Sequence, residues 1–214
     1  MRTLIALAAA AAMTTGCVIV VDGDDDDWDD GKRDSFRMNL VADYSGPFKA
    51  AQTHELSSFE KIDASAGTDV TVIHGDRFEI RLDDRAIGRT SYEVRGNTLK
   101  ISCDRPCGNG SRGSVEVMAP SLSAIEVSSG AHLEVSEGFE ESRLNLSASS
   151  GARLDASMLA ANSASASASS GASIQLSASD HLSASASSGA RIHYNGNPDS
   201  VNVSESSGGS IKKH

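Results

Sequence analysis

Apolar and polar positions alternate with a period of two over much of the second half of the chain, from Ile125 to Lys212. One phrase interrupts the alternation at regular intervals, a pair of serines followed by glycine and a small residue. Its five copies recur every 18 to 21 residues, with their glycines at Gly130, Gly151, Gly171, Gly189 and Gly208. A period of this length is typical of repeat proteins, in which each repeat is one structural unit.

Four columns of mostly apolar residues flank the glycine when the five copies are superposed. The columns five and three residues before it are Ile125, Leu146, Ala166, Ala184 and Val203, and Val127, Ala148, Ala168, Ala186 and Glu205. The columns three and five residues after it are Leu133, Leu154, Ile174, Ile192 and Ile211, and Val135, Ala156, Leu176, Tyr194 and Lys213. Period-two alternation indicates β-strands with one buried face. Each repeat is therefore predicted to be a strand, a corner at the glycine, a second strand and a connection.

These repeats predict an all-β fold, a single-stranded parallel β-helix or β-solenoid with coils of about 18–21 residues stacked about 4.8 Å apart. The Ala/Ser run from Ser163 to Ser169 is also compatible with a disordered linker or a weak helix. The register favours the coil, because Ala166 falls in the same column as Leu146. Alanine is therefore expected to point inward and serine outward, around a narrow core.

The residues from 59 to 120 contain one more copy of the pattern and then depart from it. Gly67 has apolar residues three and five positions away on both sides, which predicts a first coil. Residues 78–82 alternate as a strand, and a Gly-Asn dipeptide between two short alternating segments predicts a β-hairpin over residues 92–101. This excursion is expected to cover a sheet edge or an open end of the core, because exposed strand edges promote aggregation.

The first 17 residues have the features of a bacterial export signal. The apolar run from residue 4 to 13 is too short to span a bilayer as a mature helix, and it is followed closely by Gly16-Cys17. This ending resembles a lipobox, although Thr14 stands where leucine is usual. Cys17 is the candidate lipidation site, and an ordinary cleaved signal with an unmodified Cys17 is the alternative. Either predicts export to the cell envelope, and lipid would attach the protein to a membrane without a spanning helix, in the outer membrane or periplasm of a Gram-negative cell.

Residues 18–58 are predicted to form an acidic, largely disordered tether before a solenoid domain at 59–214. Seven aspartates and no basic residue lie between Asp22 and Asp30, a composition typical of solvated, self-repelling segments. A specific calcium loop is not favoured, because the spacing lacks the alternation and the glutamate of an EF-hand. The chain has a net charge of −10. Without a basic patch interleaved with aromatic residues, nucleic acid is not an expected partner.

The two remaining cysteines, Cys103 and Cys107, form an even pair in an oxidising compartment. They are predicted to close a small disulfide loop, in which Pro106 preforms the bend. A metal site at these cysteines is not favoured, because no further ligands lie at the spacing of a zinc site. No metal or cofactor is expected.

Four motifs occur in order along the chain: the segment from Phe59 to Asp63, the segment from Gly67 to Asp76, the hairpin Gly96-Asn97-Thr98-Leu99-Lys100-Ile101, and the segment from Val115 to Leu122 before the repeated Ser-Gly-Ala phrases. In order and spacing they resemble the putative auto-transporter adhesin, head GIN domain family. The resemblance covers about Phe59 to Ile211 and implies a secreted or envelope-anchored bacterial β-solenoid. It brings no established catalytic residues.

The polar positions between the columns that follow the glycine provide a candidate ligand face. They lie two and four residues after the glycine and include His132, Glu134, Arg153, Asp155, Arg191 and His193. On stacked coils these side chains would share one sheet face, with Glu134 and Asp155 on neighbouring coils. Such a face could hold a cation or a sugar, or it could be a solvated surface that keeps the sheet soluble and in register.

Two classes of function are compatible with these features. The first is a non-enzymatic envelope lipoprotein that presents a rigid β-solenoid and binds a glycan, another envelope protein or a surface, as an adhesin would. The alternative is a polysaccharide-active enzyme on the same coil. An enzyme requires a non-repeating cluster of acids and bases in a groove, and no triad order, phosphate loop or paired-acid motif stands out in the sequence. The sequence therefore favours a binding protein.

Overall fold

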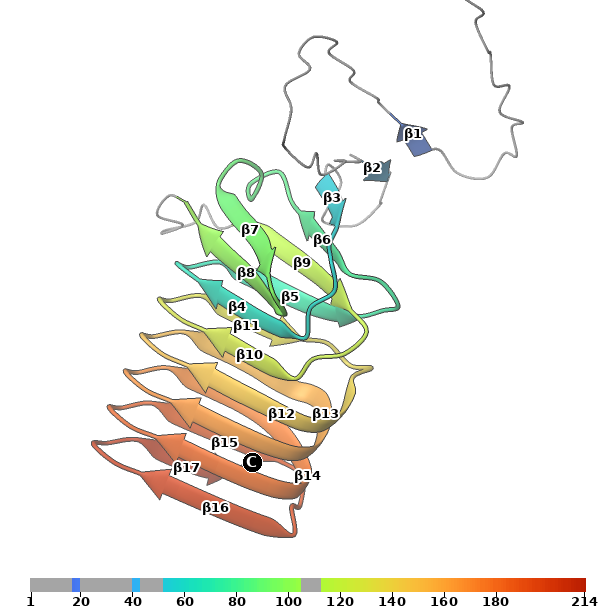
Figure 1. Cartoon of the computed structure of the whole chain (residues 1–214). Coiled ribbons are helices and arrows are strands. Elements are labelled where there is room, and N and C mark those ends of the chain that lie inside the picture. The colour runs from blue at the N-terminus through green and yellow to red at the C-terminus, as the bar shows by residue number, and fades with distance from the viewer. Residues whose placement is uncertain (1–16, 20–39, 43–51, 105–112) are drawn as a thin grey trace, which may run out of the picture.

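The computed structural model describes residues 17–19, 40–42, 52–104 and 113–214, and in these residues every regular element is a strand (Figure 1). Together the strands form one mixed sheet, so the prediction of an all-β fold is confirmed. The strands are β1 Cys17–Ile19, β2 Leu40–Ala42, β3 Gln52–Glu55, β4 Lys61–Ser65, β5 Asp69–His74, β6 Glu79–Leu82, β7 Thr90–Arg95, β8 Thr98–Cys103, β9 Ser114–Ala119, β10 Ala124–Val127, β11 His132–Val135, β12 Glu140–Ala148, β13 Arg153–Ala168, β14 Ser173–Ala186, β15 Arg191–Asn195, β16 Ser200–Glu205 and β17 Ser210–Lys213.

Most of the sheet consists of two parallel ladders that enclose the core between them. Ladder A contains, in spatial order, β8, β4, β10, β12, the second halves of β13 and β14, and β16. Ladder B contains β9, β5, β11, the first halves of β13 and β14, β15 and β17. In Figure 1 the strands of ladder A lie in front of those of ladder B. Each repeat thus contributes one rung to each ladder.

The register confirms the predicted columns. In ladder A the successive partners are Ile125, Leu146, Ala166, Ala184 and Val203. In ladder B they are Leu133, Leu154, Ile174, Ile192 and Ile211. The copy around Gly67 is also in register, because Ile62 pairs with Ile125 and Val70 pairs with Leu133. The two strands predicted around Gly67 therefore join the two ladders in the predicted register.

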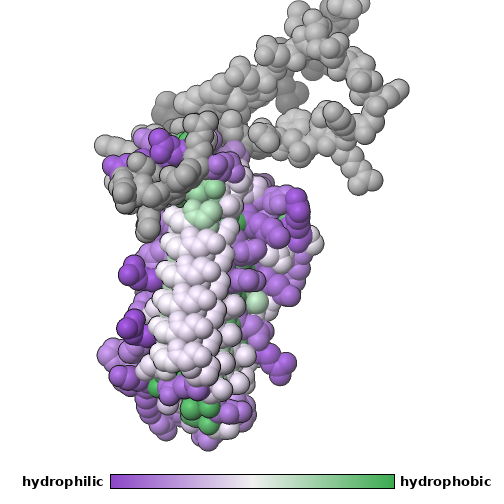
Figure 2. All heavy atoms as spheres, turned by 90° about the vertical axis from the view of Figure 1, so that its left-hand side faces the viewer, coloured by the Kyte–Doolittle hydropathy of each residue, from purple (hydrophilic) through white to green (hydrophobic). Residues whose placement is uncertain are grey.

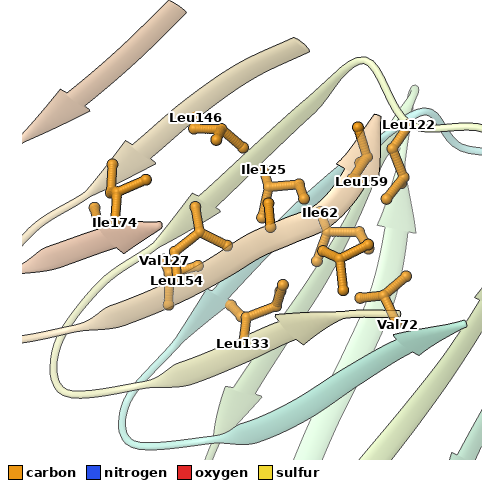
Figure 3. Packing of buried hydrophobic residues seen from close by; sticks show 14 of the residues in the cluster. Ile62, Val72, Leu122, Ile125, Val127, Leu133, Leu146, Leu154, Leu159 and Ile174 are labelled. Atoms are coloured by element: carbon orange, nitrogen blue, oxygen red, sulfur yellow. The ribbon is translucent and has the colours of Figure 1, made fainter. Parts of the chain in front are cut away.

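Alanine points inward and serine outward in the low-complexity run, as predicted. Ala164, Ala166 and Ala168 are at most 5% exposed, whereas Ser165 and Ser167 are exposed. Larger residues offset the small volume of alanine elsewhere in the core. Figure 3 shows the side chains of Leu133 and Leu154 from ladder B in the same interior space as those of Ile125 and Leu146 from ladder A.

A tight turn at each Ser-Ser-Gly phrase joins ladder A to ladder B. In the repeat at Gly171, the backbone N–H of Ala172 donates a hydrogen bond to the carbonyl of Ser169, at 3.1 Å. The two central residues, Ser170 and Gly171, have φ of 52° and 72°, and two successive positive values are the mark of a type I′ turn. Gly151 donates its N–H to Ser170 of the next turn at 3.0 Å. The turns therefore stack into a straight edge, the pale strip between hydrophilic residues in Figure 2.

The prediction of a purely parallel coil is too narrow, because the N-terminal end of the sheet is antiparallel. Strand β7 pairs antiparallel with β8 across the Gly96-Asn97 turn, which confirms the predicted hairpin. Strand β6 lies antiparallel between β9 and β3. The excursion lies at one end of both ladders, as expected, but β8 and β9 also pair parallel with β4 and β5 and so add a further rung.

Several predicted features fall outside the described residues. These are most of the export signal, the Asp22–Asp30 run and Cys107. Strand β3 lies before residue 59 and pairs with β6. Within the described ranges, no helix has the length and apolar character needed to cross a membrane.

Candidate ligand-binding face

Ladder A presents two straight columns of mostly polar side chains to solvent, because alternate residues of each strand point away from the core. The first column is Thr98, Lys61, Ala124, Asn145, Ser165, Ser183 and Asn202. The second is Lys100, Asp63, Glu126, Ser147, Ser167, Ser185 and Ser204. Successive members of a column are about 4.8 Å apart. Charged residues gather in the rungs of β8, β4 and β10, and serine dominates the later rungs.

The charged end of this face is hollowed. A hollow of about 450 Å³ lies over β8, β4, β10, β12 and β13. A second hollow, of about 420 Å³, lies over β7, β8 and β4. Both are lined by Asp63 and Lys100, so they adjoin each other, and we call them together the trough. Its polar lining includes Lys61, Asp63, Tyr92, Glu93, Thr98, Lys100, Glu126, Asn145 and Ser147.

Most charged side chains of the trough are exposed, although Asp63 is half-buried and Glu93 is ion-paired with Arg95 at 2.7 Å. Among the described residues, Lys61, Asp63, Lys100 and Glu126 take part in no ion pair. Asp63 is the register partner of Lys100 on one side and of Glu126 on the other. A positive position and two negative positions therefore follow one another on adjacent rungs, with their hydrogen-bonding capacity available to a ligand.

The one aromatic residue that lines the trough, Tyr92, packs against the end of the core. Tyr92 on β7 is half-buried and lines the smaller hollow. Its ring lies 5.7 Å from the ring of His54 on β3, with the two planes inclined at 43°. Tyr92 is the register partner of the buried Ile101 and packs against the core, so its ring lies on the core face of the sheet and not on the face that presents Lys100.

The ligand face predicted from the sequence lies on ladder B, and the structure brings together four of its six residues. His132 pairs with Arg153, and Glu134 pairs with Asp155, so these four occupy two neighbouring rungs. Arg191 and His193 lie two rungs beyond Arg153 and Asp155, separated from them by the rung of Ser173 and Gln175. The face therefore divides into two groups.

Part of the polar capacity of the ladder B face is used within the protein. The Asp155 carboxylate accepts hydrogen bonds from the backbone N–H and the hydroxyl of Ser157, at 3.0 and 2.6 Å. The Nδ1 atom of His132 lies 3.3 Å from a carboxylate oxygen of Asp69, a contact that is ionic only when His132 is protonated. Whether this face binds a ligand stays a prediction.

The sequence reasoning did not find the trough, although a signal for it exists. Leu99 and Ile101 alternate around Lys100 in the same way as Ile62 and Ala64 alternate around Asp63. Because this segment lacks a Ser-Ser-Gly phrase, its sequence predicts a covering hairpin and not a rung of ladder A. Lys100 lies beside Asp63 because β8 pairs with β4, and the repeat pattern does not predict this pairing.

A second charged cluster, on β6 and β9, is built into the sheet. Glu79 is only 5% exposed. Its carboxylate lies 3.1 Å from the guanidinium of Arg77 and 3.5 Å from that of Arg81, and Arg81 also lies 3.0 Å from Glu116. The cluster ties β6 to β9, which is a structural role.

The described part of the chain contains no group of three His, Cys, Asp or Glu side chains arranged to hold a metal ion. Cys103 is the last residue of β8, and Cys107 lies outside the described residues. The Cys103–Cys107 bridge therefore stays a prediction.

Comparisons with known proteins connect this fold to adhesin-like proteins. The family described as putative auto-transporter adhesin, head GIN domain, matches residues 58–152 and 140–198. No curated protein matches the chain. Similar solved structures include a putative adhesin from Bacteroides fragilis, which is 18% identical with a TM-score of 0.49, covering 77% of this chain and 96% of the other. A putative lipid binding protein from Parabacteroides distasonis is 17% identical with a TM-score of 0.34, at the same two coverages. A putative cell adhesion protein from Clostridium sporogenes is 11% identical with a TM-score of 0.36, covering 77% and 99%.

Proposed function

Since the chain belongs to the putative auto-transporter adhesin, head GIN domain family, we propose that it is a non-enzymatic binding protein of the bacterial cell envelope. In this proposal the stacked repeats form a β-solenoid that serves as a rigid support. Its ligand is a component of the envelope or of another surface, and the trough on ladder A is the binding site. The trough supports this role because it is hollowed and carries unneutralised charges.

The proposal is tested by binding of the purified chain to isolated envelope fractions in a sedimentation assay. Replacing Asp63 and Lys100 together with alanine removes a negative and a positive group that line both hollows. Binding is expected to weaken about tenfold or more, as when charged groups at the centre of an interface are truncated.

The matched control replaces Glu134 and Arg153, which lie on the face of ladder B, with alanine. This double variant also removes one charge of each sign from exposed positions on neighbouring rungs. It is expected to bind as the parent chain does. If only the ladder B variant lost binding, the face predicted from the sequence would be the site, and the trough would be a solvated surface.

Attachment to the membrane is a separate part of the proposal. Cys17, the first residue of β1, would be the lipidated N-terminus of the mature protein, because it follows the apolar run of the export signal. One or two acyl chains would then hold the protein at the membrane surface. Mass spectrometry of the mature protein should find an acylated Cys17; cleavage elsewhere or an unmodified cysteine would rule out this anchor.

The second candidate function, a polysaccharide-active enzyme, is favoured by one observation. Asp63 and Glu126 are register partners, so two carboxylates lie on adjacent rungs inside the trough. Most glycoside hydrolases use a pair of carboxyl groups as their catalytic residues. An assay for new reducing ends in polysaccharides incubated with the chain separates the two functions. Release that disappears on replacing Asp63 with asparagine would favour the enzyme, and no release would favour the binding protein.

A further inference from the structure

The chemistry of the trough narrows the class of ligand that can bind there. Its apolar lining residues are covered by their own sheet: Ile62, Ile125 and Leu146 are at most 3% exposed. The surface offered to a ligand therefore consists mainly of ammonium, carboxylate, amide and hydroxyl groups. A lipid chain or an apolar peptide would find little apolar surface to bury against it.

The charges of the trough argue against a polyanion. The two lysines Lys61 and Lys100 are balanced by Asp63 and Glu126, and Glu93 is paired with Arg95, so the lining has no positive excess. A strongly anionic ligand is bound by an excess of basic residues. Donors and acceptors are instead interspersed along the trough. This distribution suits an uncharged ligand whose groups both donate and accept hydrogen bonds, as sugar hydroxyls do.

The geometry of the trough favours a long ligand with a regular repeat. Its rungs from β8 to β13 keep an unbroken register where the trough lies, without a bulge. Five rungs at the spacing of adjacent strands span roughly 20 Å along the ladder. A β-1,4-linked sugar chain is extended, and its advance per sugar unit is close to the spacing of the rungs.

We propose, resting on the binding function above, that the trough binds a linear, uncharged β-linked glycan that runs along ladder A with about one sugar unit per rung. Asp63, Lys100, Glu126 and Asn145 hydrogen-bond its hydroxyl groups. The glycan thereby meets one row of polar side chains at each rung, and each rung contributes a similar share of the affinity.

A length series tests this proposal with the full chain and defined probes. The probes are β-1,4-linked oligosaccharides of glucose and of N-acetylglucosamine, from the disaccharide to the octasaccharide, with binding measured by calorimetry. Affinity is expected to rise with each added sugar and to level off at about five units, when every rung of the trough is occupied. An affinity that does not depend on length would overturn the proposal, because a single subsite would explain it.

Two asparagines in the same outward column provide a matched pair of variants. Asn145 lines the trough, and Asn202 lies three rungs beyond it. Asn145→Ala is expected to weaken binding of the longer oligosaccharides about tenfold, equivalent to 1.4 kcal/mol, and Asn202→Ala to leave binding unchanged. The melting temperature of Asn145→Ala should fall only slightly, because the hydrogen bond that its amide donates to the carbonyl of Ser123, at 3.3 Å, is exposed. Equal effects of the two variants would place the glycan outside the trough and overturn the proposal.

Failure of this inference is distinguishable from failure of the proposed function. The same oligosaccharides are added as competitors to the envelope-binding assay. If binding depends on Asp63 and Lys100 but only an acidic oligosaccharide or a protein fraction competes, the neutral glycan is ruled out while the binding function stands. If envelope binding does not depend on these two residues, the trough is not the binding site, and both the site assignment and the glycan proposal are overturned.

Discussion

At the scale of single residues, alternate positions of one low-complexity run have opposite environments. Ala166 is 3% exposed and pairs with Leu146 on one side and Ala184 on the other. The next residue, Ser167, belongs to the same strand and ladder but is exposed. Substitutions at these two positions therefore distinguish the contribution of burial to stability from the contribution of strand pairing.

Aspartate at these two positions should have very different effects on stability. Ala166→Asp places a carboxylate in a narrow apolar core and is expected to cost several kcal/mol of the free energy of unfolding. Ser167→Asp keeps its carboxylate in water and should stay within about 0.5 kcal/mol of the parent. Urea denaturation of both variants measures the difference. Equal and small changes would mean that the alternating columns do not define the core.

The turn residues provide a second prediction, which concerns backbone strain. Gly171 has φ of 72°, and a Cβ added there would meet nothing within 4 Å. The cost of Gly171→Ala is therefore only that of a left-handed conformation, roughly 1 kcal/mol. Ser170→Gly, at φ of 52°, is the control. It should change stability by less than about 0.5 kcal/mol, because glycine relieves the backbone strain but also makes the unfolded chain more flexible. If Gly171→Ala lowered the free energy of unfolding no more than Ser170→Gly does, this account of the turn would be wrong.

At the scale of elements, the ion pairs of β6 determine how firmly the antiparallel end is held. Arg81 contacts two carboxylates, those of the buried Glu79 and of Glu116 on β9. Arg81→Met is expected to cost about 2 kcal/mol, less than a fully buried pair because the arginine is partly exposed. Arg77→Met, at a side chain that is 63% exposed, should cost less than about 1 kcal/mol. Chemical denaturation measures both, and similar losses would show that burial of the pair does not matter.

The elements also show what the sequence could and could not predict. The columns through Ile125 and Leu133 were predictable, because alternation and a fixed period both mark them. The inward alanines were predictable for the same reason. The rung made by β8 and β9 was not predictable, because no Ser-Ser-Gly phrase joins these two strands. Their parallel partners, β4 and β5, also precede them in the chain. The trough depends on that rung, so it could not be predicted either. The sequence pattern points to the ladder B face instead.

At the scale of the whole molecule, the buried core extends from Phe59 to Ile192, and the last strand of ladder A, β16, contributes nothing to it. Every residue of β16 is exposed, and Val201 and Val203 are 43% and 49% exposed. In the middle of ladder A, by contrast, Leu144 is fully buried. Packing therefore holds the middle rungs more firmly than β16.

This gradient predicts unequal protection from hydrogen exchange. The amides of residues 200–205 should exchange about tenfold or more faster than those of residues 144–148, because regions with few buried contacts open locally at lower cost. Exchange followed by mass spectrometry on the intact protein measures both segments. Uniform protection along ladder A would indicate that the ladder opens only as a single unit.

The spatial order of the rungs has a consequence for the time course of folding. Lys61 on β4 pairs with Thr98 on one side and with Ala124 on the other, and both partners come later in the chain. During synthesis β4 and β5 therefore have no neighbouring rung until residues 98–119 have been made. The later repeats differ, because each of them finds its template in the rung made just before it. Pairings between distant segments form slowly. The N-terminal strands should thus assemble together as one nucleus. The later repeats should then add to it one at a time, in sequence order.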